Sequence, residues 1–521
     1  MLRVGQCLLP LSRSYCRCVH TTRLVKEDPR WPGWNVVVGI EVHAQIKSRQ
    51  KLFSHALTSD LSEPPNTHVV SFDAAFPGTL PRLNPKCVEL GVRTAIALNC
   101  QVQRRSAFDR KHYFYPDLPS GYQITQHYAP LATDGTLRLS EEDAVVRIKQ
   151  IQLEQDTGKT TFDPRRRIST IDLNRAGTGL MEIVSEPDLR SPEEAGEYVR
   201  ALQALLRSVG SSDGNMEQGS LRCDVNVSVN RQHESLGTRC EIKNLNSVKF
   251  MMVAITCEAF RQIELLEKGL PVIQETRGFD EASAATFSLR NKEDAPDYRY
   301  MPDPNLPPLL LDQTYINTIR QSMPELPQET RSRLLAQGLS ERDADVLMAI
   351  DMGREVGYDG VLGHGAVAYF DTVSRGRDPK VVVNWITHEL LGQLALRKET
   401  FKENRFSTEQ LGELIDLVQS KRITGTSGRM LLRHILTHGS SEMPSKLAEK
   451  MSLFVSASDS TSLETWCKEV IEALPEEAQA VRNGNMNVLN KLVGRVMKTS
   501  KGRADAKAVR NALQDLLSTK M

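Results

Sequence analysis

The chain has 521 residues, of which 40% are hydrophobic, and this length is too great for a single core. Its 66 Lys and Arg residues balance 65 Asp and Glu residues, so the formal net charge of +1 excludes any argument for a polyanionic partner from overall charge. No run of 18 or more apolar residues occurs, and the sequence therefore predicts no membrane insertion.

The first 26 residues differ in composition from the rest of the chain. They contain Arg, Lys, Ser and Thr residues, whereas the first acidic residue is Glu27. An Arg-rich, hydroxyl-rich start without acids is typical of a mitochondrial transit peptide. A disordered basic tail is the alternative. We predict a transit peptide over residues 1–26 and a location in the mitochondrial matrix.

Residues 36–46 predict the first strand. After Val38 apolar and polar residues alternate, which places Glu41 and His43 together on the polar side of a half-buried strand. Residues two apart in a strand lie about 7 Å from each other, so both side chains can reach one ion. The alternative is a solvent-exposed strand face with an ordinary ion pair.

Three further segments predict strands. Residues 146–156 alternate with a phase slip near Lys149 that indicates a bulge. Residues 221–229 and 238–244 alternate clearly and predict a hairpin. The polar side of this hairpin carries charges of both signs, which fits either a solvated sheet or the floor of a site.

A helix is predicted between these strands. Ser191 is its expected N-cap, Glu194 completes a capping box, and Gly210 ends the helix. The Pro-rich stretch 296–309 is incompatible with a regular helix or a central strand, and we interpret it as a rigid functional loop. Beyond about residue 325 the pattern is mostly helical.

The end of the chain is locally basic. From residue 481 onward there are nine Lys or Arg residues and two acids, and the basic residues of the segment 491–498 share one helix face. A basic stripe backed by apolar residues suits contact with an RNA phosphate backbone, whereas a solvated basic face is the alternative. The predicted RNA contacts are Lys491, Arg495, Lys498, Lys501 and Arg503.

Short segments from residue 35 to residue 520 resemble, in the same order, the B subunit of glutamyl-tRNA(Gln) amidotransferase. Any one segment is a weak signal, but the ordered set is specific, and the transit-like start favours a mitochondrial member. The segments are 39–43, 108–111, 113–119, 121–124, 153–159, 172–177, 182–188, 219–226, 241–247, 274–277, 297–300 and 492–497.

The resemblance implies an α+β fold with three parts. Residues 27–322 are expected to form a cradle-shaped, glutamine synthetase-like catalytic domain. Residues 323–400 are expected to form a helical linker domain, and residues 401–521 an all-α, tRNA-binding tail domain.

The resemblance also implies a reaction. ATP phosphorylates the side-chain carboxylate of Glu-tRNA(Gln), and ammonia displaces the phosphate to give Gln-tRNA(Gln). The ammonia comes from a partner, the amidase or A subunit, and a small C subunit joins the complex. The sequence itself contains no Gly-rich Ser cluster or Cys–His pairing typical of an amidase, which fits this division of labour. A free-standing ligase for a small acid and a non-catalytic tRNA-binding or assembly factor are the alternatives.

Phosphoryl transfer requires cations and metal around the reacting oxygens, and the resemblance implies ATP and Mg²⁺ as cofactors. The resemblance implies His43, Glu154 and Glu217 as metal ligands, and we add Glu41 and Asp156 as further predicted ligands. Bacterial relatives often have a second acid where this chain has Gln155 and Gln218, so the remaining ligands are where this chain departs from the family pattern.

Basic residues are expected to bind the nucleotide. Because Arg forms bidentate contacts with phosphate, Arg299 in the Pro-rich loop is the strongest candidate. Ordinary surface ion pairs are the alternative for each residue. Lys111 lies in a segment that the family associates with the ammonia route. The predicted nucleotide contacts are Lys159, Arg175, Arg277, Lys292 and Arg299, and the predicted catalytic residues are Glu41, His43, Glu154, Glu217 and Arg299.

Overall fold

The computed structural model describes most of the chain from Glu27 to Ser518. The predicted transit peptide, Lys292, Lys501 and Arg503 lie outside the described residues. Within this span, the residues not described are Leu61, 140–143, 292–296, 456–458, Gly484, 501–503 and Asp505.

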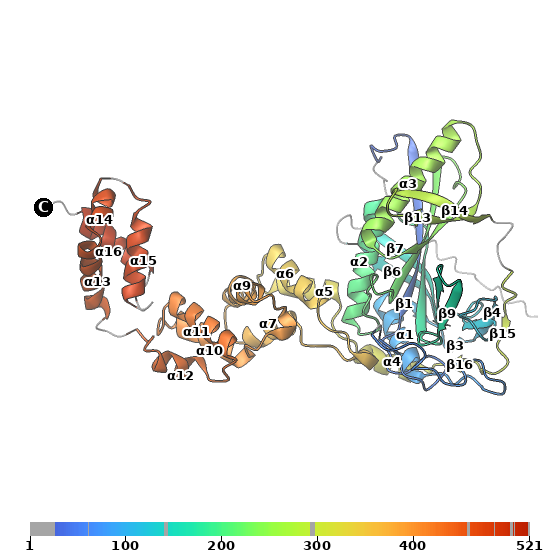
Figure 1. Ribbon diagram of the computed structural model, residues 1–521, viewed down its shortest axis with the longest axis horizontal. Coiled ribbons are helices and arrows are strands. Elements are labelled where there is room, and N and C mark those ends of the chain that lie inside the picture. The colour runs from blue at the N-terminus through green and yellow to red at the C-terminus, as the bar shows by residue number, and fades with distance from the viewer. Residues whose placement is uncertain are drawn as a thin grey trace, which may run out of the picture.

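A nine-stranded sheet organises the first part of the molecule (Figure 1). Strand β1 (Trp34–Gln45) lies between β10 (Gly179–Ser185) and β11 (Leu221–Arg231) and is antiparallel to both. The sheet continues beyond β10 with β7 (Val145–Gln155), β6 (Ala132–Arg138) and β2 (Gln101–Val102). Beyond β11 it continues with β12 (Cys240–Leu245), β13 (Glu275–Asp280) and β14 (Ala285–Asn291), and β12 and β13 are parallel.

Three helices cover one face of this sheet (Figure 1): α1 (Pro85–Ala97), α2 (Pro192–Ser208) and α3 (Val248–Glu267). The alternation of β1 explains this, because Ile40 and Val42 point into the core and are almost completely buried. The polar residues of β1 therefore point to the opposite face.

A smaller sheet lies on that opposite face. It consists of β15 (Met301–Pro302), β4 (Asp109–His112) and β5 (Tyr122–Thr125). The Gln123 side chain of β5 donates a hydrogen bond of 2.8 Å to the carbonyl of Gln155, which ties the two sheets together. The paired strands β8 (Lys159–Asp163) and β9 (Ile168–Asp172), and β3 (Arg105–Ser106) and β16 (Leu309–Leu310), complete the strands.

The predicted strands and the bulge are confirmed. On β7, Lys149 is the extra residue, because Gln150 pairs with Val184 whereas Ile148 pairs with Ser185. The capping box is partly wrong: the Ser191 hydroxyl accepts from the Glu194 amide as expected, but the Glu194 carboxylate accepts from the amide of Arg190, one residue before the cap.

The rest of the chain is helical and extends away from the sheet in Figure 1. One hydrophobic cluster spans residues 334 to 454, and a separate cluster spans residues 463 to 517. The expected boundary at 400/401 falls inside the first of these clusters, because α10 packs against α7 and α11. Among the described residues, no helix is both long and apolar enough to cross a membrane.

These helices follow the chain order. They are α4 (Gln313–Gln321), α5 (Pro327–Ala336), α6 (Glu341–Met352), α7 (Ala366–Val373), α8 (Pro379–Asn384), the π-helix η3 (Trp385–Leu390), α9 (Leu391–Leu396), α10 (Thr408–Gln419), α11 (Gly425–His438), α12 (Pro444–Lys450), α13 (Asp459–Ala473), α14 (Pro475–Arg482), α15 (Leu489–Thr499) and α16 (Ala506–Ser518). The 3₁₀ turns η2 (Tyr358–Gly360) and η4 (Phe401–Glu403) lie between them.

Candidate active site

The polar face of β1 gathers acidic side chains from both neighbouring strands. In the sheet register, Glu41 lies opposite Asp224 of β11, and His43 lies opposite Glu182 of β10. Residues directly opposite each other in an antiparallel pair point to the same face. The register therefore places Glu41, His43, Asp224 and Glu182 together.

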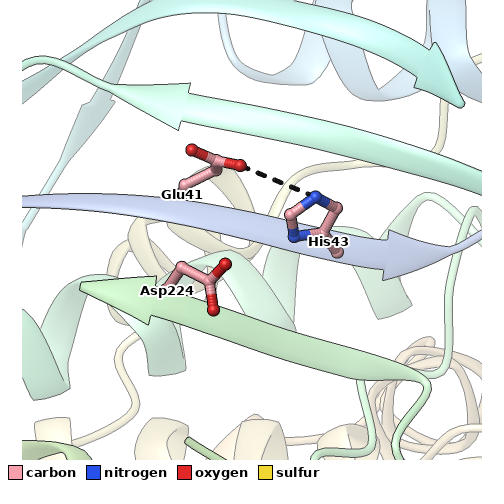
Figure 2. A group of neighbouring side chains, drawn as sticks. All are labelled: Glu41, His43 and Asp224. Carbon is pink, nitrogen blue, oxygen red and sulfur yellow. Dashed lines mark ion pairs between the residues drawn. The ribbon is translucent and has the colours of Figure 1, made fainter. Parts of the chain in front are cut away.

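Glu41, His43 and Asp224 form the first acidic group (Figure 2). One ligand atom from each residue lies within 4.8 Å of the others. The Nε2 atom of His43 is 3.6 Å from Oε1 of Glu41. All three side chains are only partly buried, so a ligand can reach them from the open side of the sheet.

His43 also belongs to a second acidic group with Glu154 and Glu182. Its Nε2 atom is 3.9 Å from Oε2 of Glu182, and Gln152 donates a hydrogen bond to that same oxygen. Oε2 of Glu154 is buried and has no hydrogen-bond partner among the described residues. A buried carboxylate oxygen without a partner is costly, so this oxygen is suited to binding a cation or a hydrogen-bond donor.

Electrostatic interactions between these acids are strong. Burial raises the pKa of Glu182 well above its usual range, and the nearby carboxylates of Glu154 and Glu41 raise it further. Burial also acts to lower the pKa of Lys111, but the carboxylates of Glu154 and Glu182 outweigh burial and raise that pKa. The Lys111 ammonium lies 3.7 Å from Oε1 of Glu154 and remains charged.

A second lysine, Lys243 of β12, contacts the first group. Its ammonium lies 2.8 Å from Asp224 and 3.1 Å from Glu241. Burial opposes its charge, but these two carboxylates raise the pKa of Lys243 overall. Lys111 and Lys243 both line a pocket of about 1230 Å³ on the polar side of the sheet. The two lysines that line this pocket thus contact one member of each acidic group, Glu154 and Asp224.

Asp156 is held by arginine side chains. Oδ2 of Asp156 lies 2.6 Å from the guanidinium of Arg222 and 3.6 Å from that of Arg175. Arg175 also donates to the carbonyl oxygens of Thr157 and Gly158, at 2.9 and 2.6 Å. The predicted ligand Asp156 and the predicted nucleotide contact Arg175 thus lie together in an ion-pair cluster beside the two acidic groups.

Arg277 points to the other side of the sheet. It lies opposite Ile242, which is buried in the core, and its Nε atom is 3.2 Å from the carboxylate of Glu258 on α3. Burial acts to raise the pKa of Glu258, but hydrogen bonds from Arg261 and Gln262 lower it overall. The predicted nucleotide contact Arg277 is therefore packed among the helices.

Three other predicted residues are exposed. Glu217 lies in the turn before β11, and Lys159 lies on the β8–β9 hairpin. The Arg299 side chain is 80% exposed, lines the 1230 Å³ pocket and lies 3.3 Å from the carboxylate of Asp297. Of these three residues, only Arg299 lines the pocket.

The sequence patterns missed three residues of this site: Glu182, Asp224 and Lys243. The alternation of residues 221–229 does place Asp224 on the polar side, so that signal was present. The sequence patterns gave no such signal for Glu182. It lies in a short strand, and its position opposite His43 of β1 becomes visible only in the tertiary fold.

The donor set fits a divalent cation. Carboxylate oxygens are the ligands that Mg²⁺ prefers, and Mg²⁺ usually keeps several waters, so three or four protein ligands are sufficient. The unpartnered oxygen of Glu154 and the close approach of Glu41, Asp224 and Glu182 to His43 supply such ligands.

Comparison with known proteins places this site in a class. Residues 36–317 match the GatB/GatE catalytic domain family, and residues 368–517 match the GatB domain family. The large sheet, with its acidic face, is thus a catalytic domain of the GatB/GatE type.

Curated relatives cover nearly the whole chain. The mitochondrial B subunit of glutamyl-tRNA(Gln) amidotransferase from Laccaria bicolor is 59% identical, over 99% of this chain and 98% of the relative. The protein of the same name in Mycosarcoma maydis is 45% identical, over 93% of this chain and 86% of the relative. The B subunit of aspartyl/glutamyl-tRNA(Asn/Gln) amidotransferase from Rickettsia bellii is 42% identical, over 93% of this chain and 98% of the relative. The chain belongs to the family of glutamyl-tRNA(Gln) amidotransferase B subunits.

Proposed function

We propose that this chain phosphorylates the side-chain carboxylate of Glu-tRNA(Gln) with ATP and amidates it with ammonia, giving Gln-tRNA(Gln) for mitochondrial translation. The observation that carries the proposal is the pair of acidic groups sharing His43 beside a pocket lined by Lys111 and Lys243. Carboxylate activation needs acids for metal and cations for developing phosphate charge on the same surface.

Glu41, His43 and Glu154 are the proposed metal ligands retained from the sequence prediction. Asp224 and Glu182 are added because they lie in the same groups. These residues would hold Mg²⁺, which would supply positive charge to balance that on the transferred phosphoryl group. Removal of one of these carboxylates would leave the remaining acids less able to hold the ion.

Arg299 and Lys243 are the proposed phosphate contacts, since both line the pocket. Among the described residues, the Arg299 guanidinium pairs with the exposed Asp297 at 3.3 Å, a contact that a phosphate can displace at little cost. The Lys243 ammonium holds a fixed position between Asp224 and Glu241. Together they place positive charge at the mouth and at the floor of the pocket.

Lys111 is the proposed gate on the ammonia route. Its ammonium lies 3.7 Å from Glu154 and lines the pocket, so a nucleophile that approaches Glu154 from the pocket would pass close to it. The ammonia would come from the amidase or A subunit, and a small C subunit would complete the complex in the mitochondrial matrix. Because Lys111 stays charged, it repels ammonium ions and favours the passage of neutral ammonia.

The cradle-shaped domain over residues 27–322, the linker over 323–400 and the tRNA-binding tail over 401–521 remain proposals. For the tail, support comes from α15, where Lys491, Arg495 and Lys498 are exposed and the opposite side is buried against the last hydrophobic cluster.

The test uses the purified complex with its partner subunits. His43→Ala removes the residue shared by both acidic groups, and ATP-dependent amidation of Glu-tRNA(Gln) should fall by more than about 100-fold. Glutamine hydrolysis by the partner amidase should persist. His364→Ala, at an exposed loop position, is the matched control. Normal amidation by His43→Ala would instead favour a non-catalytic tRNA-binding or assembly factor.

A further inference from the structure

Three consecutive aromatic residues follow β4 at the mouth of the pocket. Tyr113 is partly buried, whereas Phe114 is 87% exposed and Tyr115 is 61% exposed. Phe114 packs over the turn at Gly121, where an added Cβ would lie 3.1 Å from its ring. Large aromatic side chains exposed to this degree are unusual and mark binding surfaces.

These rings continue inward as a row. The Tyr113 ring lies edge-on to Tyr115 at 5.6 Å and to Tyr298 at 5.9 Å. The Lys111 ammonium lies 5.2 Å from the centre of the Tyr298 ring. The row therefore runs from the exposed Tyr115 to the lysine that contacts Glu154, and Phe114 lies beside Tyr115 in the chain and also lines the pocket.

The second side of the mouth is fixed in place. The amide of His112 donates to the carbonyl of Tyr298 at 2.8 Å, and the His112 ring lies 3.1 Å from the carbonyl of Arg299. Strand β15 continues this pairing with β4. The loop that carries Tyr298 and Arg299 is thus held against the strand that leads to Phe114.

The chemistry of this mouth fits the end of a nucleic acid chain. Among the described residues, the pocket lining includes Lys111, Lys243 and Arg299 but one carboxylate, Asp297. Positive charge combined with open aromatic faces is how proteins hold single-stranded nucleic acid, because every base can stack on an aromatic ring.

We propose that Phe114 and Tyr115 form a stacking platform for the terminal adenine base of the tRNA 3′ end. This rests on the proposed function, in which the reacting glutamyl group is esterified to the terminal ribose. If the glutamyl carboxylate reaches Glu154 and Lys111, the short ester linkage confines the terminal base to the pocket mouth. Both residues act by positioning and take no part in the bond changes.

The experiment is a double-mutant cycle with the full complex. Wild-type and Phe114→Ala proteins are assayed with a glutamylated RNA minihelix and with the same RNA carrying an abasic terminal ribose. Loss of one base stack should raise KM by roughly 10- to 100-fold, while kcat at saturating RNA stays near wild type. Because the base and the ring contact each other, Phe114→Ala should cause no further loss with the abasic RNA.

Control variants and further outcomes test the stacking proposal. Phe114→Trp should restore KM, and Phe260→Ala, an exposed aromatic on α3 behind the sheet, should leave it unchanged. Equal losses with both RNAs would overturn the proposal. Loss of the amidase from the Phe114→Ala complex in a pull-down would also overturn it, in favour of a protein–protein contact within the complex. Absence of amidation by the wild-type complex would instead refute the proposed function.

Discussion

At the scale of single residues, the site contains carboxylates that the neighbouring basic side chains do not fully balance. Glu182 is almost completely buried beside Glu154 and close to Glu41, and its pKa is raised for that reason. Lys111 contacts only one oxygen of Glu154, and the other oxygen lacks a partner among the described residues. A divalent cation would relieve both costs at once.

This arrangement gives a prediction about Glu182. Glu182→Gln keeps the shape of the side chain but removes a carboxylate, so the Mg²⁺ concentration for half-maximal amidation should rise roughly 10- to 100-fold. The measurement is an amidation rate against Mg²⁺ concentration in the purified complex. Glu217→Gln is the comparison, because Glu217 is exposed and outside both acidic groups. A larger effect from Glu217→Gln would restore the sequence-based ligand set.

Arg277 gives a second prediction at this scale. Its removal leaves Glu258, which is fully buried, with fewer partners, so Arg277→Met should destabilise the protein by on the order of 3 kcal/mol. The midpoint of denaturant unfolding measures this effect. Arg277→Met combined with Glu258→Gln should recover part of the loss, since no buried charge is then left alone. A stable Arg277→Met protein with a raised KM for ATP would support the predicted nucleotide contact.

At the scale of elements, local patterns predicted the strands and the hairpin of β11 with β12, but not the pairing of strands that are distant in sequence. Alternation in residues 36–46 and 221–229 is a local signal, and both became strands with the expected polar sides. The pairing of His43 with Glu182, and the direction of Arg277 toward α3, depend on long-range register. Propensity and periodicity carry no information about such register, which explains why Glu41 and His43 were found and Glu182 was not.

The joint between the sheet domain and the helices gives a third prediction. Tyr358 donates a hydrogen bond to Asp60 at 3.0 Å, and the amide of Asp359 donates to the carbonyl of Lys47, just beyond β1, at 2.8 Å. Tyr358→Phe removes one bond worth about 1 kcal/mol, so limited proteolysis near residues 353–365 should become several-fold faster. Tyr315→Phe, on α4, is the control. Unchanged cleavage would mean that this joint is held by other contacts.

At the scale of the whole molecule, the described parts form an extended chain of units, with α13–α16 far from the sheet in Figure 1. The basic face of α15 lies on this distant unit. Of its three predicted RNA contacts, Lys491 is already in an ion pair, 2.6 Å from Glu477 of α14. Lys491 is therefore less available to RNA than Arg495 and Lys498. Helical spacing alone could not reveal this difference.

This inequality gives the fourth prediction. Arg495→Ala with Lys498→Ala should raise the KM for tRNA and lower the slope of its salt dependence by about 2, since each lost phosphate contact lowers that slope by about 0.9. Lys491→Ala should have the smaller effect. The measurement is KM against KCl concentration, with the exposed Lys249→Ala on α3 as control. Unchanged tRNA binding in the double variant would remove α15 from the tRNA interface.

The central position of β1 also determines when the site can exist. β1 ends at Gln45, but the strands on its two sides begin only at Gly179 and Leu221. During synthesis, the second acidic group needs β7 and β10 beside His43, whereas the first group also has to wait for Asp224 of β11. Long sequence separation between paired strands slows folding and leaves strand edges open to aggregation. A chain that stops before residue 221 can therefore hold neither the first acidic group nor a closed centre of the sheet.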